Sequence, residues 1–109
     1  MKIAKMDRRI TLERVTNGRD AVGGVSESWA TLTTVWAERR NLKGRELMEA
    51  AQKSAEAEVL FVVRYSTVLG TVSAADRVKM GTEYFDVVSV TEVPGGRPVK
   101  VELLTKRAA

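Results

Sequence analysis

The segment Glu58–Ser66, with the sequence EVLFVVRYS, restricts the possible folds of this chain more than any other part. Successive side chains of a strand lie on opposite faces of the sheet, and here both faces are apolar: Val59 to Tyr65 at the odd positions, Leu60 and Val62 at the even ones. Two apolar faces are typical of a strand that is covered on both sides. We therefore predict a central strand, or a strand whose outer face is covered by another subunit.

Other segments of alternating polar and apolar residues flank this strand. Strands are predicted over 8–15, over 25–42 (one long strand, or two with a break near Ala30-Thr31), over 73–93 as a pair joined at Gly81, and over 99–104. The glycine-rich residues 16–24 predict a mobile loop, and the PGGRP motif at 94–98 predicts a turn. This spacing indicates an all-β fold, a small antiparallel β-barrel of about six strands. A barrel also removes the exposed edges of valine-rich strands.

A helix is predicted near the middle of the chain. Gly44 can form a bend, and apolar residues recur at helical spacing over 45–57. The apolar face of this helix would consist of Leu47, Met48, Ala51 and Ala55. Because the face is narrow and rich in alanine, it can pack closely but buries little area. We expect one helix or long loop inserted between strands near residues 41–57.

Length and composition restrict the class of protein. With 109 residues, of which 44% are apolar and 29% charged, the chain is expected to form one globular domain over residues 1–109. An N-terminal arm is expected at 1–7 and a C-terminal tail at 105–109. No apolar run approaches the roughly 20 residues that cross a bilayer, and the start lacks the apolar core of a signal peptide. We therefore expect synthesis in the cytoplasm and no membrane contact.

No catalytic, cofactor-binding or metal site is predicted. The chain has no cysteine and no histidine, which excludes Ser-His-Asp and Cys-His arrangements and removes the commonest transition-metal ligands. The glycines near residue 20 do not form a phosphate-binding motif. Asp76, Glu83 and Asp86 are expected to be solvated charges and not metal ligands. We therefore expect that the protein is not an enzyme.

A small basic nucleic-acid-binding module is one alternative. The net charge is +4 and the isoelectric point is about 9.7, although the basic residues form only short clusters. Binding to single strands needs exposed aromatic side chains between basic residues. We expect Trp29 and Trp36 to pack in the core or at a barrel end. Tyr84, near Lys79 and Arg64, is then the one candidate for stacking on a base.

A series of short motifs runs along nearly the whole chain. They are DRRITLER at 7–14, a loop with Asp20 and Gly24, a tryptophan at Trp29, VWAE at 35–38, GREL at 44–47, RY at 64–65, and a hairpin with Val78, Gly81, FDV at 85–87 and Val90. Each motif is short, but in this order and spacing they resemble the head–tail joining proteins of long-tailed bacteriophages, also called head-closure, stopper or head–tail adaptor proteins.

The resemblance implies a structural role in the virion neck, without enzymatic activity or cofactor. Members of that family form a homo-oligomeric ring, usually of twelve subunits, beneath the portal and its adaptor. The ring keeps the genome inside the head and offers a docking surface to the tail, where a tail terminator or tail-completion protein follows. The resemblance also implies a small β-barrel with a long central excursion between strands. Another ring-forming tail or neck protein, such as a tail terminator, stays open as an alternative.

A ring subunit presents a different surface to each of its two neighbours. The apolar helix face and the outer face of the strand at 58–66 are the natural candidates. The predicted subunit-interface residues are Leu47, Met48, Ala51, Leu60 and Val62. Basic residues at the strand-to-helix joint could contact the phosphates of genomic DNA in a channel, a contact that does not read sequence. These residues are Arg39, Arg40, Lys43 and Arg45. The alternative, that these four residues are solvated charges or form ion pairs between subunits, is slightly favoured.

Overall fold

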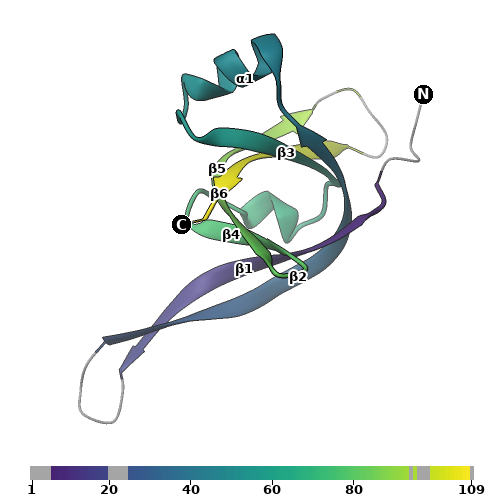
Figure 1. Ribbon diagram of the computed structural model, residues 1–109. Helices are drawn as coiled ribbons and strands as arrows, with labels where there is room; N and C mark the ends of the chain where they lie inside the picture. Colours follow the sequence, from purple (N-terminus) through teal and green to yellow (C-terminus); the bar gives the residue numbers. More distant parts are fainter. Residues whose placement is uncertain (1–5, 20–24, 94, 96–98, 109) are drawn as a thin grey trace.

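Six antiparallel strands form one closed sheet in the order β1-β2-β3-β6-β5-β4 (Figure 1). In this computed structural model, residues 6–19, 25–93, 95 and 99–108 are described. The elements are β1 (Arg8–Arg19), β2 (Val25–Asn41), α1 (Gly44–Ala51), β3 (Ala57–Arg64), the 3-10 helix η2 (Leu69–Thr71), β4 (Asp76–Met80), β5 (Glu83–Val93) and β6 (Lys100–Arg107). The predicted β-barrel with a helical insertion between strands is confirmed.

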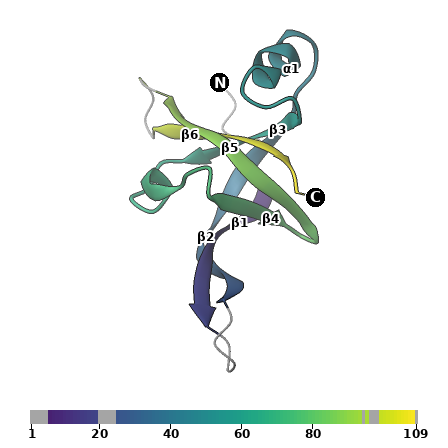
Figure 2. The ribbon, with the colours of Figure 1, turned by 90° about the vertical axis from the view of Figure 1, so that its left-hand side faces the viewer.

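Strands β1 and β2 form a hairpin that extends well beyond the closed part of the sheet (Figures 1 and 2). Strand β1 pairs with β2 along its full length, whereas only residues 11–14 of β1 also pair with β4. The molecule is therefore elongated, with extents of 55 × 29 × 24 Å. The prediction of a loop from residue 16 is wrong at its start, because β1 continues to Arg19. The side chains of Thr16 and Ser28 hydrogen-bond across this extension at 2.9 Å. Residues 20–24 lie outside the described part.

Strand β2 is one strand with an irregularity, not two strands. Leu12 pairs with Thr33 and Glu13 with Thr31, so that Leu32 is an extra residue on β2. This register shift falls beside the predicted break at Ala30-Thr31. Bulges bend a strand and increase its twist. The bulge lies where the hairpin leaves the closed sheet, and we infer that it directs the hairpin away from the barrel.

The core lies inside the closed sheet. Phe61 on β3 and Phe85 on β5 meet edge to face, with ring centroids 5.3 Å apart and planes at 71°. Leu69 of η2 belongs to the same apolar cluster. The other buried members are Ile10, Leu12, Ala37, Val59, Val63, Val72, Val78, Val87, Val101 and Leu103. Val59, Phe61 and Val63 of β3 thus face the core, as their alternation predicts.

Both tryptophans lie outside the core, contrary to the prediction. Trp29 is 37% exposed and Trp36 is 54% exposed. Trp36 points outward because its neighbour Ala37 is fully buried, and successive strand residues face opposite sides. Each indole ring contacts an arginine instead. The guanidinium carbon lies 4.0 Å from the ring centroid for Arg77 over Trp29 and 5.0 Å for Arg9 over Trp36.

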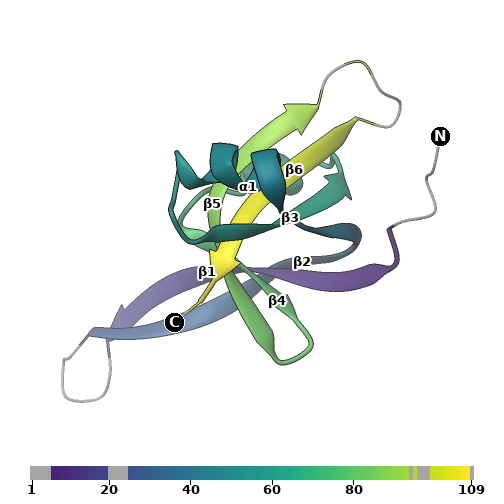
Figure 3. The same ribbon diagram turned by 45° about the horizontal axis from the view of Figure 1, so that its top comes forward.

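Helix α1 is shorter than predicted and lies against the outer side of the barrel, next to β3 (Figures 1 and 3). It has eight residues, and turns connect it to β3. Gly44 begins the helix with φ of +60°, a backbone conformation that favours glycine, so the predicted bend is present. The chain turns after the helix through hydrogen bonds from the N–H of Lys53 and Ser54 to the carbonyl of Ala50.

Strand β6 is longer than predicted. The sequence indicated a strand that ends at Leu104 and a tail from residue 105, but pairing continues to Arg107. Thr105 is fully buried, and its hydroxyl donates a hydrogen bond to the carbonyl of Val59 at 2.9 Å. Val99, predicted to face inward, is 36% exposed. The predicted turn at 94–98 lies outside the described residues, except for Gly95.

Two ion pairs connect β1 to β4. Asp76, predicted to be solvated, is buried and accepts hydrogen bonds from Arg14 at 2.9 and 3.0 Å and from the N–H of Ser73 at 3.0 Å. Glu13 accepts a hydrogen bond from Arg77 at 2.7 Å. Because β1 and β4 pair in register here, each carboxylate lies beside a guanidinium of the other strand. Such charge-assisted hydrogen bonds are stronger than neutral ones.

Candidate functional site

Helix α1 exposes apolar side chains that its own barrel does not cover. One side of the helix packs on a small cluster through Ala50, which is buried. The other members of the cluster are Ala57 and Leu104, with Leu42, Leu60 and Val88 partly buried. On the other side Met48 is 74% exposed, Leu47 is 38% exposed and Ala51 is exposed. The structure thus brings three of the five predicted interface residues to one open helix surface.

The two predicted interface residues on β3 lie in different environments. Leu60 is partly buried beneath α1, and its accessible edge lines a groove of about 240 Å³ between helix and sheet. Val62 is 2% exposed, so its side chain is not available to a neighbouring subunit. Val62 lies between Glu38 of β2 and Glu102 of β6 in the sheet register, on the same face. The alternation of apolar residues correctly indicates an outward face for Val62, but this face is covered within the chain.

The basic residues predicted to face DNA do not form one patch. Arg39 and Arg40 project to opposite faces of β2. The Arg39 side chain is 16% exposed, and it lies 3.3 Å from the Glu83 carboxylate and 5.3 Å from the Phe85 ring centroid. Arg40 donates a hydrogen bond to Glu38 at 2.9 Å, which raises the pKa of its guanidinium. Both arginines are thus engaged within the chain.

Lys43 and Arg45 have a different environment, at the joint between β2 and α1. Both side chains are exposed, on either side of Gly44. Within the described residues, neither side chain forms an ion pair. Of the four basic residues predicted at this joint, these two are available to an external anion.

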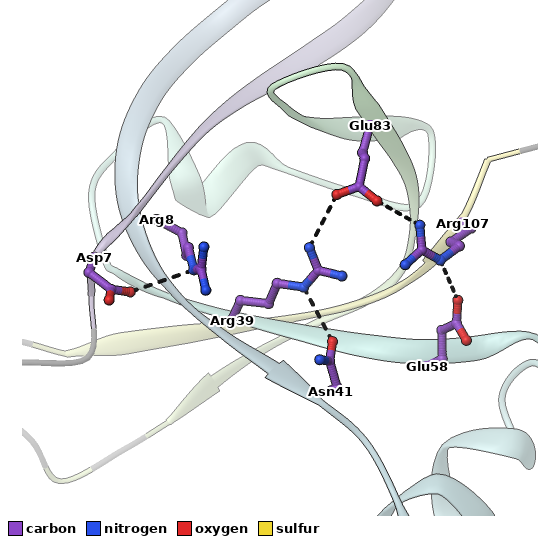
Figure 4. Close-up of polar contacts among 7 residues, drawn as sticks. All are labelled: Asp7, Arg8, Arg39, Asn41, Glu58, Glu83 and Arg107. Carbon is purple, nitrogen blue, oxygen red and sulfur yellow. Dashed lines mark hydrogen bonds and ion pairs between the residues drawn. The ribbon is translucent and has the colours of Figure 1, made fainter.

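Glu83 connects two arginines at the end of the barrel (Figure 4). Its carboxylate accepts hydrogen bonds from Arg107 at 2.7 Å and from Arg39 at 3.3 Å. The hydrogen bond from Arg107 is the main reason why the pKa of Glu83 is below its ordinary value, and the same bond raises the pKa of Arg107. Arg107 also donates to Glu58 at 3.0 Å. These contacts therefore connect β2, β5, β6 and β3. Glu83 is an ion-pair partner of two arginines, so the prediction that it is a solvated charge is wrong.

A second exposed surface, not predicted from the sequence, lies beyond the end of β3. It is a groove of about 540 Å³, called here the Trp36–Tyr65 groove, and its lining includes Arg9, Val35, Trp36, Arg64, Tyr65 and Ser66. Trp36 is 54% exposed and Tyr65 is 45% exposed. If Ala37 is assigned to the core, the alternation of side chains along β2 places Trp36 on the outer face of the sheet. The exposure of Tyr65 has no comparable sequence signal, because it follows the strand.

The candidate aromatic residue for nucleic-acid stacking is already in contact with cations. The Tyr84 ring has the Arg77 guanidinium 4.2 Å and the Lys79 ammonium 5.9 Å from its centroid. Arg64, expected beside it, lines the Trp36–Tyr65 groove instead. Tyr84 and Trp29 therefore hold Arg77 between them, and this arrangement positions the hairpin relative to β4 and β5.

Among residues 6–19, 25–93, 95 and 99–108, no group of three or more acidic, histidine or cysteine side chains is arranged to hold a metal ion. No helix in the same part of the chain is long and apolar enough to cross a membrane. The notable features are an apolar helix surface, an aromatic groove and a network of ion pairs.

Comparison with known proteins gives a family and two structural neighbours. The family model described as "Phage head completion protein" matches residues 1–105. The solution structure of protein SF1141 from Shigella flexneri 2a is similar, with a TM-score of 0.75 and 23% identity over 100% of this chain and 98% of that one. A chain in the virion of a native gene transfer agent particle has a TM-score of 0.56 and 21% identity, with 94% of each chain covered. No curated protein matches the sequence.

Proposed function

Because the chain belongs to the phage head completion protein family, we propose that it assembles into a ring of identical subunits in the neck of the virion. It is a structural protein of the head–tail neck, which agrees with the family resemblance in its motifs. In the proposal, the ring lies beneath the portal and its adaptor, closes the DNA-filled head and offers a docking surface to the tail. Twelve subunits are expected from the resemblance.

The exposed apolar surface of α1 is the observation that carries this proposal. Met48, at 74% exposure, and Leu47, at 38%, lie on a helix that stands on the outside of the barrel. Burial of a side chain of this size contributes about 1.5–3 kcal/mol, so a neighbouring subunit that covers them gains stability. We propose Leu47, Met48 and Ala51 as interface residues, with Leu60 at the edge of the contact.

The partners of the ring follow from its position in the neck. The portal or adaptor protein lies on the head side, and a tail terminator or tail-completion protein lies on the tail side. The similar fold of a chain in a gene transfer agent virion supports a place in the particle. Lys43 and Arg45 are the basic residues that we propose for contact with DNA phosphates in the channel, since Arg39 and Arg40 are paired within the chain.

Deletion of the gene from the phage that encodes the chain tests this function. We expect heads and tails to accumulate separately in electron micrographs, with DNA lost from the heads. A copy of the gene supplied from a plasmid should restore joined particles, and a tag on that copy should locate at the head–tail junction. Normal tailed particles without the chain would contradict the proposal.

A further inference from the structure

We propose that the projecting hairpin of one subunit pairs edge to edge with the hairpins of its two neighbours, so that the ring contains a continuous antiparallel sheet. The projecting hairpin is defined here as residues 15–19 of β1 and 25–29 of β2. The occupant of each of its edges is a second copy of this chain. The inference rests on the proposed ring and identifies a contact that is separate from the surface of α1.

The projecting hairpin has two open edges. Strand β1 pairs with β4 only through residues 11–14, and β2 pairs with β3 only through residues 37–41. Within the described part of the chain, the projecting hairpin therefore has no partner strand on the outer side of β1 or on the outer side of β2. Figures 1 and 2 show this segment standing clear of the barrel. The unpaired N–H and C=O groups of such an edge are a template for another strand.

The sequence of the projecting hairpin permits this pairing. Edge strands of natural proteins are often protected by lysine or proline, and the segments VTNGR and VSESW contain neither. One arginine and one glutamate give the projecting hairpin no net charge, although the whole chain has a net charge of +4. Identical hairpins therefore do not repel one another. Because a two-stranded hairpin by itself is marginally stable in water, additional strands on its edges stabilise it.

A ring brings the two edges together in the correct orientation. In the proposed ring the hairpins run along the ring axis, so that all of them project in one direction. Because β1 runs toward the tip and β2 runs back, β1 of one subunit is antiparallel to β2 of the next. The two edges are different surfaces, as a head-to-tail contact requires. Identical neighbours cover both edges with one repeated contact, whereas any other partner has to supply two strands.

Contacts with the barrel fix the direction of the projecting hairpin before assembly. The guanidinium carbon of Arg77 lies 4.0 Å from the ring centroid of Trp29 in the hairpin and 4.2 Å from that of Tyr84 on β5. Next to the hairpin, Arg14 donates two hydrogen bonds to the buried carboxylate of Asp76. Preorganisation of this kind reduces the entropy that is lost when neighbouring hairpins pair.

The pairing within each hairpin restricts the register between subunits. Thr16 lies opposite Ser28 in its own chain. In antiparallel strands the backbone groups of alternate residues point to alternate edges, so that even-numbered residues of β1 meet even-numbered residues of the neighbouring β2. Thr16 is therefore expected opposite Ser26, Ser28 or Ala30 of the next subunit. Opposite residues are about 4.5–5.5 Å apart between Cα atoms, which is within the range of a disulfide.

Disulfide cross-linking between subunits with one cysteine each tests this contact, because the natural chain has no cysteine. A phage without the gene is supplied with Thr16→Cys together with Ser26→Cys, Ser28→Cys or Ala30→Cys, and the purified particles are oxidised mildly. We expect covalent dimers in at least one of the three mixtures. Larger species are not expected, because each subunit has a single cysteine and cannot link to both neighbours.

Two controls separate this contact from random collision. Thr16→Cys alone should give no dimers, because the edge of β1 meets an edge of β2 and not a second β1. The mixture of Thr16→Cys with Gln52→Cys is the matched control. Gln52 is exposed at the end of α1, and Figure 1 shows α1 on the side of the molecule away from the projecting hairpin.

Hydrogen exchange on the natural chain gives an independent measurement. The amides of the projecting hairpin that point outward, at alternate positions, should exchange at least about tenfold more slowly in particles than in the free subunit. If the natural chain is present in particles but no mixture gives dimers above the Gln52 control, the pairing is overturned and the proposed function stands. Unchanged exchange of these amides on assembly also overturns the pairing. If the natural chain is absent from particles, the proposed function fails as well.

Discussion

The carboxylate of Asp76 binds the guanidinium of Arg14 through both of its oxygens, at 2.9 and 3.0 Å, and the Asp76 side chain is fully buried. The hydrogen bond to Asp76 is the main reason why the pKa of the Arg14 guanidinium is above its ordinary value. The pair lies where the hairpin of β1 and β2 meets the start of β4. It therefore connects the projecting part of the molecule to the barrel.

Asp76→Asn should destabilise the fold measurably. Loss of one partner from a fully buried ion pair costs about 3–5 kcal/mol, but the Arg14 side chain is 40% exposed and can regain water, so we expect about 2 kcal/mol. Urea unfolding followed by circular dichroism measures this difference. Asp7→Asn is the matched control, because its pair with Arg8 is exposed at both ends and should change stability by less than about 0.5 kcal/mol. Equal effects of the two substitutions would contradict the role of Asp76.

Glu83 should make the stability of the fold depend on pH. Its folded-state pKa is below the ordinary value of 4.5, so its contribution is fully present above pH 4.5 and is lost as the pH falls through the folded pKa. Glu83→Gln should therefore have a lower free energy of unfolding than the natural chain at pH 7. This difference in the free energy of unfolding, called here the stability gap, should narrow steadily below pH 4.5. Urea unfolding at several pH values between 3 and 7 measures the gap. Glu92→Gln, at an exposed position, is the control and should show no stability gap at any pH. A stability gap of Glu83→Gln that is constant down to pH 3 would refute the contribution of the Glu83 ion pairs to stability.

Arg77 should hold the hairpin against β4 and β5. Its guanidinium lies between the rings of Trp29 and Tyr84 and binds Glu13 at 2.7 Å. Arg77→Ser removes all three contacts and should cost about 2 kcal/mol. Hydrogen exchange should show faster exchange of the β2 amides near Trp29 while β3 and β6 stay protected. Lys79→Ser is the control, since its ammonium is further from the Tyr84 ring, at 5.9 Å. Unchanged exchange near Trp29 in Arg77→Ser would count against this role.

The sequence predicts the barrel well because alternation directly reports which face of a strand is buried. The odd positions of β3 and the turn at Gly81 follow from local pattern alone. The helix was predicted too long, since the residues after Ala51 have helical propensity but pack as turns before β3 begins. The end of β6 was missed because the burial of Thr105 depends on a hydrogen bond to Val59, which is 46 residues away.

Side-chain partners were the part that the sequence could not predict. The sequence predicts Asp76 and Glu83 to be solvated charges because their arginine partners are distant in the sequence. Asp76 contacts Arg14 only when the sheet closes. The same closure brings Glu83 to Arg39 and Arg107. The same closure separates Arg39 from Arg40, which look like one basic cluster in the linear chain. The exposed residues of α1 were predicted from helical spacing, but the Trp36–Tyr65 groove required the three-dimensional arrangement of β1, β2 and the end of β3.

Incorporation of Met48→Asp into virions tests assembly through α1 most directly. The side chain is 74% exposed, so the variant should keep the melting temperature of the natural chain. Burial of an unpaired charge at an interface costs at least about 2 kcal/mol, roughly 30-fold in affinity at each subunit contact. We therefore predict that Met48→Asp is absent from purified particles and does not restore the titre of a phage without the gene. Ala74→Asp, at an exposed position before β4, should restore it. A Met48→Asp chain that enters particles at normal copy number and restores the full titre would contradict assembly through α1.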